Sequence, residues 1–137
     1  MTQGLELVVD TKSILGEGPC WDAEEQLLYW IDGLGKKIHI FNPNKYTNQT
    51  IDTEEAVGYI VLRESGGAVA HGLYSFDPST AQFTHLVDPE SHLPNNRFND
   101  GKCDCAGRLW PARCRKTTMK AREIRHRPVR CIALIQT

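Results

Sequence analysis

Residues 38–43 read Ile-His-Ile-Phe-Asn-Pro, and residues 73–78 read Leu-Tyr-Ser-Phe-Asp-Pro. The two stretches share the pattern apolar–x–x–Phe–Asn/Asp–Pro and begin 35 residues apart. In each copy a β-prone run ends at a turn signal, and a second hydrophobic run follows. A spacing of 35 residues is close to the roughly 40–50-residue repeat of propeller blades. The repeat therefore favours a β-propeller among the all-β folds.

The same rhythm extends on both sides of these two stretches. Short β-prone runs cut by Gly, Pro, Asn and Asp continue up to residue 110, which is typical of a sandwich, barrel or propeller. The expected strands are Leu5–Asp10, Cys20–Asp22, Gln26–Asp32, Lys37–Phe41, Tyr46–Asp52, Val57–Leu62, Ala68–Ala70, Leu73–Phe76 and Gln82–Val87. At roughly 40–50 residues per blade, residues 1–110 amount to about two blades.

Charge and aromatic content change sharply after residue 110. Residues 1–110 hold 8 Lys and Arg against 16 Asp and Glu, whereas residues 111–137 hold 8 Lys and Arg against one Glu. Every Trp, Tyr and Phe lies at or before position 110. We therefore predict two segments, a β-domain over 1–110 and a basic, weakly structured tail over 111–137.

Several function classes are disfavoured by composition. No apolar run approaches the roughly 20 residues that cross a bilayer, and the first residues lack the pattern of a secretory signal. We expect a cytoplasmic protein whose five cysteines are free thiols, with no membrane partner. The competing interpretation is that the basic tail binds an acidic partner or nucleic acid. Because the tail carries no aromatics or known motif, no nucleic-acid partner is predicted.

Single cysteine and histidine motifs do not predict a metal site. Cys103-Asp104-Cys105 is one CxC without a second pair, so we expect buried free thiols there rather than zinc. His39, His71 and His85 lack ligand spacing, and we expect structural or surface roles for them.

Three stretches together resemble the SMP-30/gluconolactonase/luciferin-regenerating-enzyme (regucalcin-like) family. They are Leu-Gly-Glu-Gly-Pro-Cys-Trp-Asp at 15–22, Leu-Tyr-Trp-Ile-Asp at 28–32 with Lys-Ile-His at 37–39, and Asn-Arg-Phe-Asn-Asp-Gly-Lys-Cys-Asp at 96–104, running on to Gly-Arg-Leu-Trp at 107–110. The resemblance covers about residues 5–110. It implies the N-terminal part of a six-bladed β-propeller and a metal-dependent sugar lactonase.

Glu17 is the candidate metal ligand. Its flanking glycines let the backbone pass close to another atom, and a carboxylate held there suits a hard divalent cation. From the residues alone, a surface glutamate in a glycine turn remains the alternative. The resemblance implies that Glu17 is the family's first ligand for one divalent cation, Ca²⁺, Zn²⁺, Mn²⁺ or Mg²⁺.

Arg97 and Asn99 are the candidate substrate-binding residues. They are two positions apart, so on an extended segment both side chains point the same way. Their donors and acceptor suit sugar hydroxyls and a lactone ring. The alternative is a strand that ends in an Asn-Asp-Gly turn. We expect Asp100 and Gly101 to be turn and support residues. The resemblance implies substrate contact for Arg97 and Asn99.

The sequence leaves the family pattern after Trp110. The family continues with Ala-Gly-Thr-Met, whereas this chain reads Pro-Ala-Arg-Cys at 111–114. The family's later Asn and Asp ligands, the second of which is also its general base, have no counterpart here, so no catalytic residue is assigned. We hypothesise that residues 111–137 are a frame-shifted or mis-spliced end.

These observations predict a metal-dependent sugar-lactone hydrolase in truncated form, acting on a small-molecule lactone. Because Ca²⁺ takes about 6–8 oxygen ligands and Mg²⁺ about six, we expect weak or absent metal binding and no catalysis by this chain alone. Exposed strand edges predict self-association. The alternatives are a calcium-binding regulatory protein of the regucalcin type without turnover, and a non-functional fragment.

Overall fold

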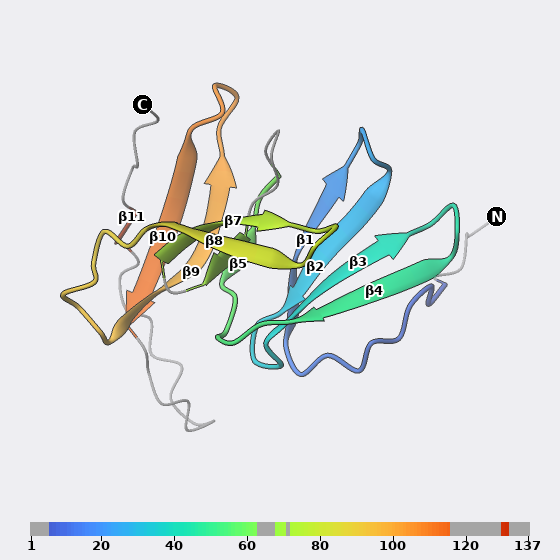
Figure 1. Ribbon diagram of the computed structural model, residues 1–137, viewed down its shortest axis with the longest axis horizontal. Coiled ribbons are helices and arrows are strands. Elements are labelled where there is room, and N and C mark those ends of the chain that lie inside the picture. The colour runs from blue at the N-terminus through green and yellow to red at the C-terminus, as the bar shows by residue number, and fades with distance from the viewer. Residues whose placement is uncertain (1–5, 63–67, 71, 116–129, 132–137) are drawn as a thin grey trace.

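The computed structural model describes residues 6–62, 68–70, 72–115 and 130–131. Every regular element in this part of the chain is a β-strand, and no helix long and apolar enough to span a membrane occurs in it. The strands form three antiparallel sheets, arranged side by side in Figure 1. The all-β prediction is therefore confirmed.

Each sheet is a meander in which strands that follow one another along the chain also pair. The first sheet contains β1 (Gly16–Asp22), β2 (Leu27–Asp32), β3 (Lys37–Asn42) and β4 (Thr47–Asp52). The second contains β5 (Tyr59–Ile60), β6 (Ala68–Ala70), β7 (Gly72–Asp77) and β8 (Gln82–Val87). The third contains β9 (Asn96–Cys103), β10 (Leu109–Arg115) and β11 (Arg130–Cys131). Two four-stranded sheets and three strands of another thus agree with the predicted partial propeller.

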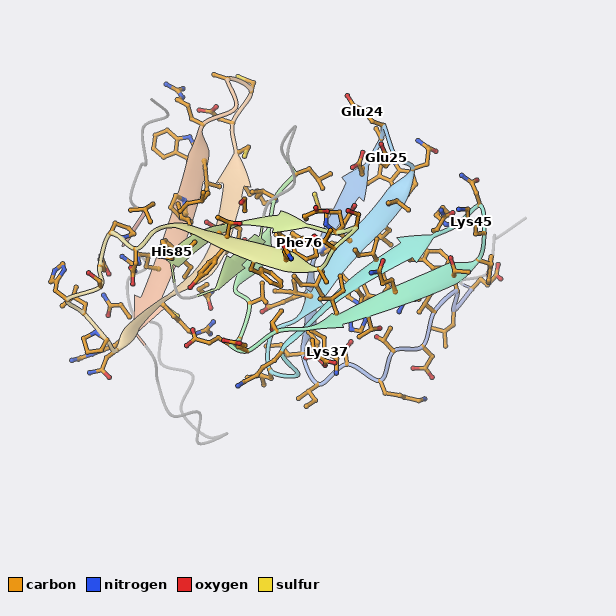
Figure 2. The ribbon with its side chains drawn as sticks, in the orientation of Figure 1. Glu24, Glu25, Lys37, Lys45, Phe76 and His85 are labelled. Carbon is orange, nitrogen blue, oxygen red and sulfur yellow. The ribbon has the colours of Figure 1, made fainter. Side chains whose placement is uncertain are left out.

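The hairpins share one local design. Their first strands end in an Asp or Asn whose side-chain oxygen accepts backbone N–H groups of the turn, at Asp22, Asn42 and Asp77, for example. Such side-chain-to-backbone bonds stabilise tight turns. A residue with positive φ then precedes the next strand, at Gln26, Lys36, Tyr46 and Ala81. Figure 2 shows Glu24 and Lys45 at the tips of two of these hairpins.

The repeated Phe-Asn/Asp-Pro pattern corresponds to equivalent positions in two sheets. Asn42 ends β3 and Asp77 ends β7, and these are the third strands of the first and second sheets. Each preceding phenylalanine is buried, with 5% of Phe41 and 2% of Phe76 exposed. The pattern therefore repeats because each third strand combines a buried aromatic with a turn-forming side chain.

Two hydrophobic clusters join the sheets. The larger one lies between the first and second sheets and consists of Tyr29, Ile31, Ile38, Ile40, Ile51, Val57, Ile60 and Phe76. The smaller one joins the second sheet to the third and consists of Tyr59, Leu73 and Phe98. Because Tyr59 and Ile60 belong to different clusters, the two-residue strand β5 contacts both neighbouring sheets.

Two glycines allow the close packing of β5 against β9. A β-carbon at Gly58 would lie 2.5 Å from the carbonyl oxygen of Phe98 in β9, and one at Gly101 would lie 2.4 Å from the ring of Tyr59. Both distances are shorter than packed atoms tolerate. Glycine at these two positions therefore lets β5 and β9 lie against each other.

One expected strand differs from the structure, and the predicted boundary at residue 110 falls inside a strand. Residues 6–10, within the strand expected over Leu5–Asp10, form no strand. Strand β10 crosses the predicted boundary at residue 110, because its last five residues pair with β9. Residues 116–129 and 132–137 of the predicted tail lie outside the described residues, so its boundary and its origin remain predictions.

Arg113 packs the end of β10 into the fold. Only 7% of the residue is exposed, and its guanidinium carbon lies 4.4 Å from the centroid of the Phe98 ring. One guanidinium nitrogen is 2.8 Å from a carboxylate oxygen of Glu90, and the other is 3.5 Å from one of Asp88. Two acidic residues before β9 thus neutralise the buried charge of Arg113. This residue belongs to the segment for which the sequence predicts a separate tail.

Candidate functional site

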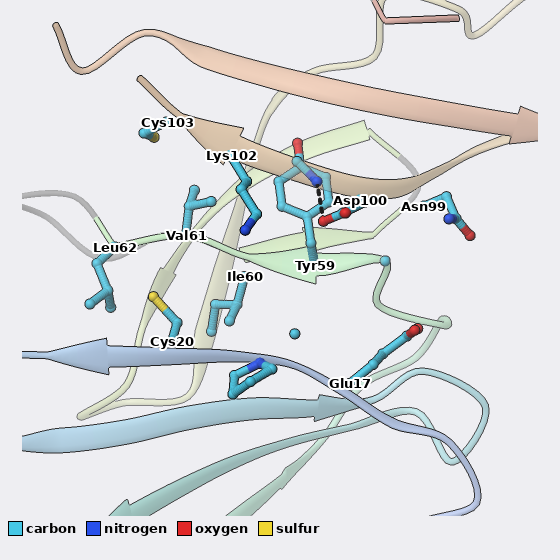
Figure 3. A pocket seen from close by; sticks show the side chains of 14 residues that line it. Glu17, Cys20, Tyr59, Ile60, Val61, Leu62, Asn99, Asp100, Lys102 and Cys103 are labelled. Atoms are coloured by element: carbon cyan, nitrogen blue, oxygen red, sulfur yellow. Dashed lines mark hydrogen bonds between the residues drawn. The ribbon is translucent and has the colours of Figure 1, made fainter. Parts of the chain in front are cut away.

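The first strands of the three sheets line a common groove of about 570 Å³. Figure 3 shows β1 along one wall, β9 along the other and β5 between them. The groove is lined by Glu17, Gly18, Pro19, Cys20, Gly58, Tyr59, Ile60, Val61, Leu62, Asn99, Asp100, Gly101, Lys102 and Cys103. Two of the three predicted site residues, Glu17 and Asn99, therefore line one groove although they are 82 positions apart in the sequence.

Glu17 lies beside a β-bulge in β1. Glu17 pairs with Ile31 and Cys20 pairs with Tyr29, so two residues of β1 face one residue of β2 between these pairs. Gly18, in the bulge, has a φ of 62°, which glycine adopts without a steric cost. Bulges bend a strand and redirect its side chains. The Gly-Glu-Gly-Pro segment precedes the strand expected over Cys20–Asp22, and in the structure it is the bulged start of β1.

The surroundings of Glu17 raise the pKa of its carboxyl group. The groove walls partly desolvate the carboxyl, and this raises its pKa above the ordinary value of 4.5. The positive charge of Arg97 acts in the opposite direction, and the negative charge of Asp100 raises the pKa further. Glu17 of β1 and two charged residues of β9 therefore influence one another across the groove.

Asn99 is the extra residue of a second β-bulge. In the pairing of β9 with β10, Phe98 is opposite Arg113 and Asp100 is opposite Ala112, so Asn99 has no partner residue. The bulge leaves both Asn99 and Asp100 exposed after the buried Phe98. The expectation that Asp100 and Gly101 form a turn is wrong, because both lie inside β9.

Arg97 and Asn99 contact each other, as their two-residue spacing predicts. Nη2 of Arg97 donates a hydrogen bond of 3.1 Å to Oδ1 of Asn99. A longer contact of 3.4 Å joins Nη1 of Arg97 to the carbonyl oxygen of Phe98. The guanidinium is thereby held beside the Asn99 amide at one end of β9. Substrate contact by either residue stays a prediction.

The groove also contains residues that sequence reasoning missed. Lys102 lines it, and Figure 3 shows its side chain reaching from β9 toward the space above β5. Cys103 and Cys20 lie on opposite walls. Cys103 belongs to the Cys103-Asp104-Cys105 motif, for which the sequence predicts buried free thiols. Both thiols are free, but they are exposed, so the expected burial is wrong.

The histidine predictions are confirmed where the structure describes them. His39 is buried, its Nδ1 lies 3.1 Å from the Thr50 hydroxyl, and its ring stacks on Trp30 with centroids 5.0 Å apart. His85 is on the exposed strand β8. His71 lies outside the described residues.

The oxygen chemistry of Glu17 fits a hard divalent cation, but its surroundings supply few further ligands. No group of three or more His, Cys, Asp or Glu that could hold a metal ion occurs among the described residues. Asp100 is the carboxylate whose charge acts on Glu17. The described residues thus bring the carboxylates of Glu17 and Asp100 to one groove, and metal binding by Glu17 stays a prediction.

Comparison with known proteins agrees with this arrangement. A family model for the SMP-30/gluconolactonase/LRE-like region matches residues 15–132. The chain belongs to this family. The match runs past the predicted boundary at residue 110, as β10 does.

Relatives within the family include enzymes and calcium-binding proteins. The chain is 36% identical over 113 residues to 6-deoxy-6-sulfogluconolactonase of Pseudomonas putida, covering 80% of this chain and 39% of that protein. It is 34% identical over 108 residues to regucalcin of Xenopus laevis, covering 77% of this chain and 36% of that protein. The crystal structure of regucalcin from Agrobacterium tumefaciens, described as a calcium-binding protein, matches with a TM-score of 0.72 and 25% identity, over 80% of this chain and 38% of that chain.

These matches confirm the predicted family and the propeller fold. The chain spans less than two fifths of the length of each of these relatives. The residues that match the family model include strands β1 and β9, which carry Glu17, Arg97 and Asn99.

Proposed function

We propose that this chain takes part in the divalent-metal-dependent hydrolysis of a sugar lactone. The observation that supports this most directly is the position of Glu17 and Asn99 in one groove, with Arg97 against the Asn99 amide. A carboxylate can hold a divalent cation, and the neighbouring hydrogen-bond donors can bind hydroxyls. Together they suit a ligand that has both hydroxyls and an oxygen able to bind the cation. The relative named 6-deoxy-6-sulfogluconolactonase supports a sugar lactone as the substrate class.

Each residue has a distinct part in this proposal. Glu17 offers carboxylate oxygens to the cation from the wall formed by β1. Arg97 and Asn99 orient the sugar from β9, through the planar guanidinium and the side-chain amide. A bound divalent cation would polarise the lactone carbonyl.

The described residues do not complete the machinery. Ca²⁺ takes about 6–8 oxygen ligands and Mg²⁺ about six, whereas Glu17 and the neighbouring Asp100 are the carboxylates of the groove. We therefore expect this chain alone to bind a cation weakly and to show little turnover. Lactone binding is the property that it retains.

Binding of glucono-1,5-lactone to the whole chain tests the proposal. Arg97→Gln removes the positive charge that lies against the Asn99 amide, and we expect it to abolish saturable binding. Lys45→Gln removes the same charge at the tip of the β3–β4 hairpin (Figure 2) and should leave binding unchanged. Equal affinity of the wild type and Arg97→Gln, or no saturable binding by the wild type, would contradict the proposal.

A second candidate function is calcium binding in regulation, without turnover. The relatives named regucalcin and the structure described as a calcium-binding protein favour it. It predicts a calcium isotherm that depends on Glu17 but is insensitive to lactone. Glu17→Gln should weaken calcium binding, while Glu24→Gln at a hairpin tip (Figure 2) should not. Calcium binding together with no lactone binding would favour this candidate over the hydrolase.

A further inference from the structure

The side-chain oxygen of Asn99 accepts two hydrogen bonds, one from its own strand and one from the neighbouring strand. Nη2 of Arg97, in the same strand β9, lies 3.1 Å away. The thiol of Cys114, in β10, donates to the same Oδ1 with a sulfur–oxygen distance of 3.6 Å. A carbonyl oxygen has two lone pairs and can accept both bonds. Asn99 is therefore held by a charged donor and by a neutral one.

Strand register explains why Cys114 reaches this position. Cys114 is directly opposite Arg97 in the pairing of β10 with β9. Side chains of directly opposed residues lie on the same face of a sheet. The bulge at Asn99 leaves that residue without a partner of its own. Its side chain is thus placed between those of Arg97 and Cys114.

These contacts fix the orientation of the Asn99 amide. A guanidinium has donors and no acceptor. The Asn99 oxygen must therefore face Arg97, because the reversed amide would bring two donors together. The thiol supplies a second anchor for the same oxygen. The amino group of Asn99, with two N–H donors, is left for the groove that this residue lines.

We propose that Cys114 is a positioning residue, which holds Asn99 so that its amino group donates hydrogen bonds to acceptor oxygens of the bound sugar. This assignment rests on the proposed function for its ligand, a sugar lactone. It adds that Asn99 is the hydrogen-bond donor in this contact and the sugar is the acceptor. Cys114 itself does not touch the ligand. Sugar hydroxyl and ring oxygens, which accept hydrogen bonds, match the donors that Asn99 presents.

Three variants of the whole chain separate positioning from packing. Cys114→Ala removes the thiol donor, Cys114→Ser keeps a donor at that position, and Cys105→Ala removes an exposed thiol from the β9–β10 turn. Because a single neutral hydrogen bond contributes modestly, we expect Cys114→Ala to weaken glucono-1,5-lactone binding about two- to fivefold. Cys114→Ser should restore affinity to within about twofold of the wild type, and Cys105→Ala should leave it unchanged.

The side-chain amide resonances of Asn99 give a readout that needs no ligand. Cys114→Ala should shift the two amide proton signals of Asn99, and Cys114→Ser should return them toward the wild-type positions. If the wild type binds no lactone, the proposed function fails, and these signals alone decide whether Cys114 positions Asn99. Unchanged Asn99 signals in Cys114→Ala would overturn the positioning role even if lactone binds.

A thiol-capping reagent extends the test to the partly exposed sulfur. Methyl methanethiosulfonate transfers its S–CH3 group to a thiolate, which forms a mixed disulfide and releases methanesulfinate. Capped Cys114 cannot donate to Asn99, so the wild type should lose lactone affinity on treatment. Cys114→Ser, treated in parallel with its other cysteines intact, should keep its affinity. An equal loss in both proteins would overturn the assignment to Cys114.

Discussion

The carboxylate of Glu17 lies against the backbone of Gly33, so close that a β-carbon at Gly33 would be 2.8 Å from Oε1 of Glu17. Gly33 follows β2 directly, and its N–H donates to the carbonyl oxygen of Leu15 at 2.9 Å. The chain before β1 and the turn after β2 are thereby joined beside the candidate ligand. The missing side chain of Gly33 is what leaves room for the carboxylate.

We expect Gly33→Ala to displace the Glu17 carboxylate without unfolding the protein. The added methyl group meets the end of a flexible side chain, which can move, so stability should change by less than about 1 kcal/mol. The pKa of Glu17, followed by carbon NMR of its carboxyl, should change because its desolvation changes. Gly16→Ala is the matched control, because a β-carbon there makes only ordinary contacts with Ser13. An unchanged Glu17 pKa in Gly33→Ala would contradict this account.

The raised pKa of Glu17 predicts a pH dependence of stability. Because the folded state holds the proton more tightly than the unfolded chain, the protonated carboxyl favours folding at low pH. This contribution is fully present below the ordinary value of 4.5 and is lost as the pH rises through the raised pKa of the folded protein. Glu17→Gln should abolish the loss, which denaturant titrations across this pH range would measure.

Two further variants check the sign of this effect. Arg97→Gln removes the cation that lowers the Glu17 pKa, so the carboxyl should titrate at still higher pH. Glu24→Gln removes a similar charge at a hairpin tip and should preserve the pH-dependent loss of the wild type. A fall of the Glu17 pKa in Arg97→Gln would show that the two side chains do not interact as the structure indicates.

Local patterns were sufficient to predict the hairpins of the first two sheets. An alternating run that ends in Asp or Asn specifies both the strand and its turn, as at Lys37–Asn42 and at Gly72–Asp77. The strand predicted over Val57–Leu62 is shorter in the structure, Tyr59–Ile60. Its length depends on contacts with other sheets, which a local pattern does not contain.

The sequence identified the residues of the candidate site but not the backbone geometry that positions them. Glu17, Arg97 and Asn99 came from motifs, yet both bulges depend on how each strand pairs with its neighbour. Asn-Asp-Gly is a strong local turn signal, and here pairing with β10 overrides it. Cys114 could not be found from the sequence, because its contact with Asn99 arises from that same register.

Strand β8 predicts self-association of the chain. It is the last strand in the order of the second sheet, and every one of its residues is exposed. Leu86 is 50% exposed and Val87 43%. An exposed apolar edge strand is a template for pairing with another chain. We expect Leu86→Lys to lower the apparent mass in sedimentation velocity, whereas Ala23→Lys, which adds the same charge at a hairpin turn, should not. A monodisperse wild-type monomer would refute this expectation.

Arg113 predicts that the end of β10 contributes to the stability of the fold. It is buried against Phe98 and paired with Glu90, so Arg113→Ala leaves a gap on the ring and removes the cation that neutralises Asp88 and Glu90. Breaking a buried ion pair in this way costs about 3 kcal/mol. Thermal and urea unfolding of the whole chain would measure the loss.

Arg108→Ala is the matched control for Arg113→Ala, because it removes an exposed ion pair with Asp104 from the same β9–β10 hairpin. A surface pair of this kind contributes less than about 1 kcal/mol. Arg113→Met should fall between the two, since its side chain still covers Phe98 but carries no charge. If Arg113→Ala were no more harmful than Arg108→Ala, residues 111–115 would not be an integral part of the third sheet.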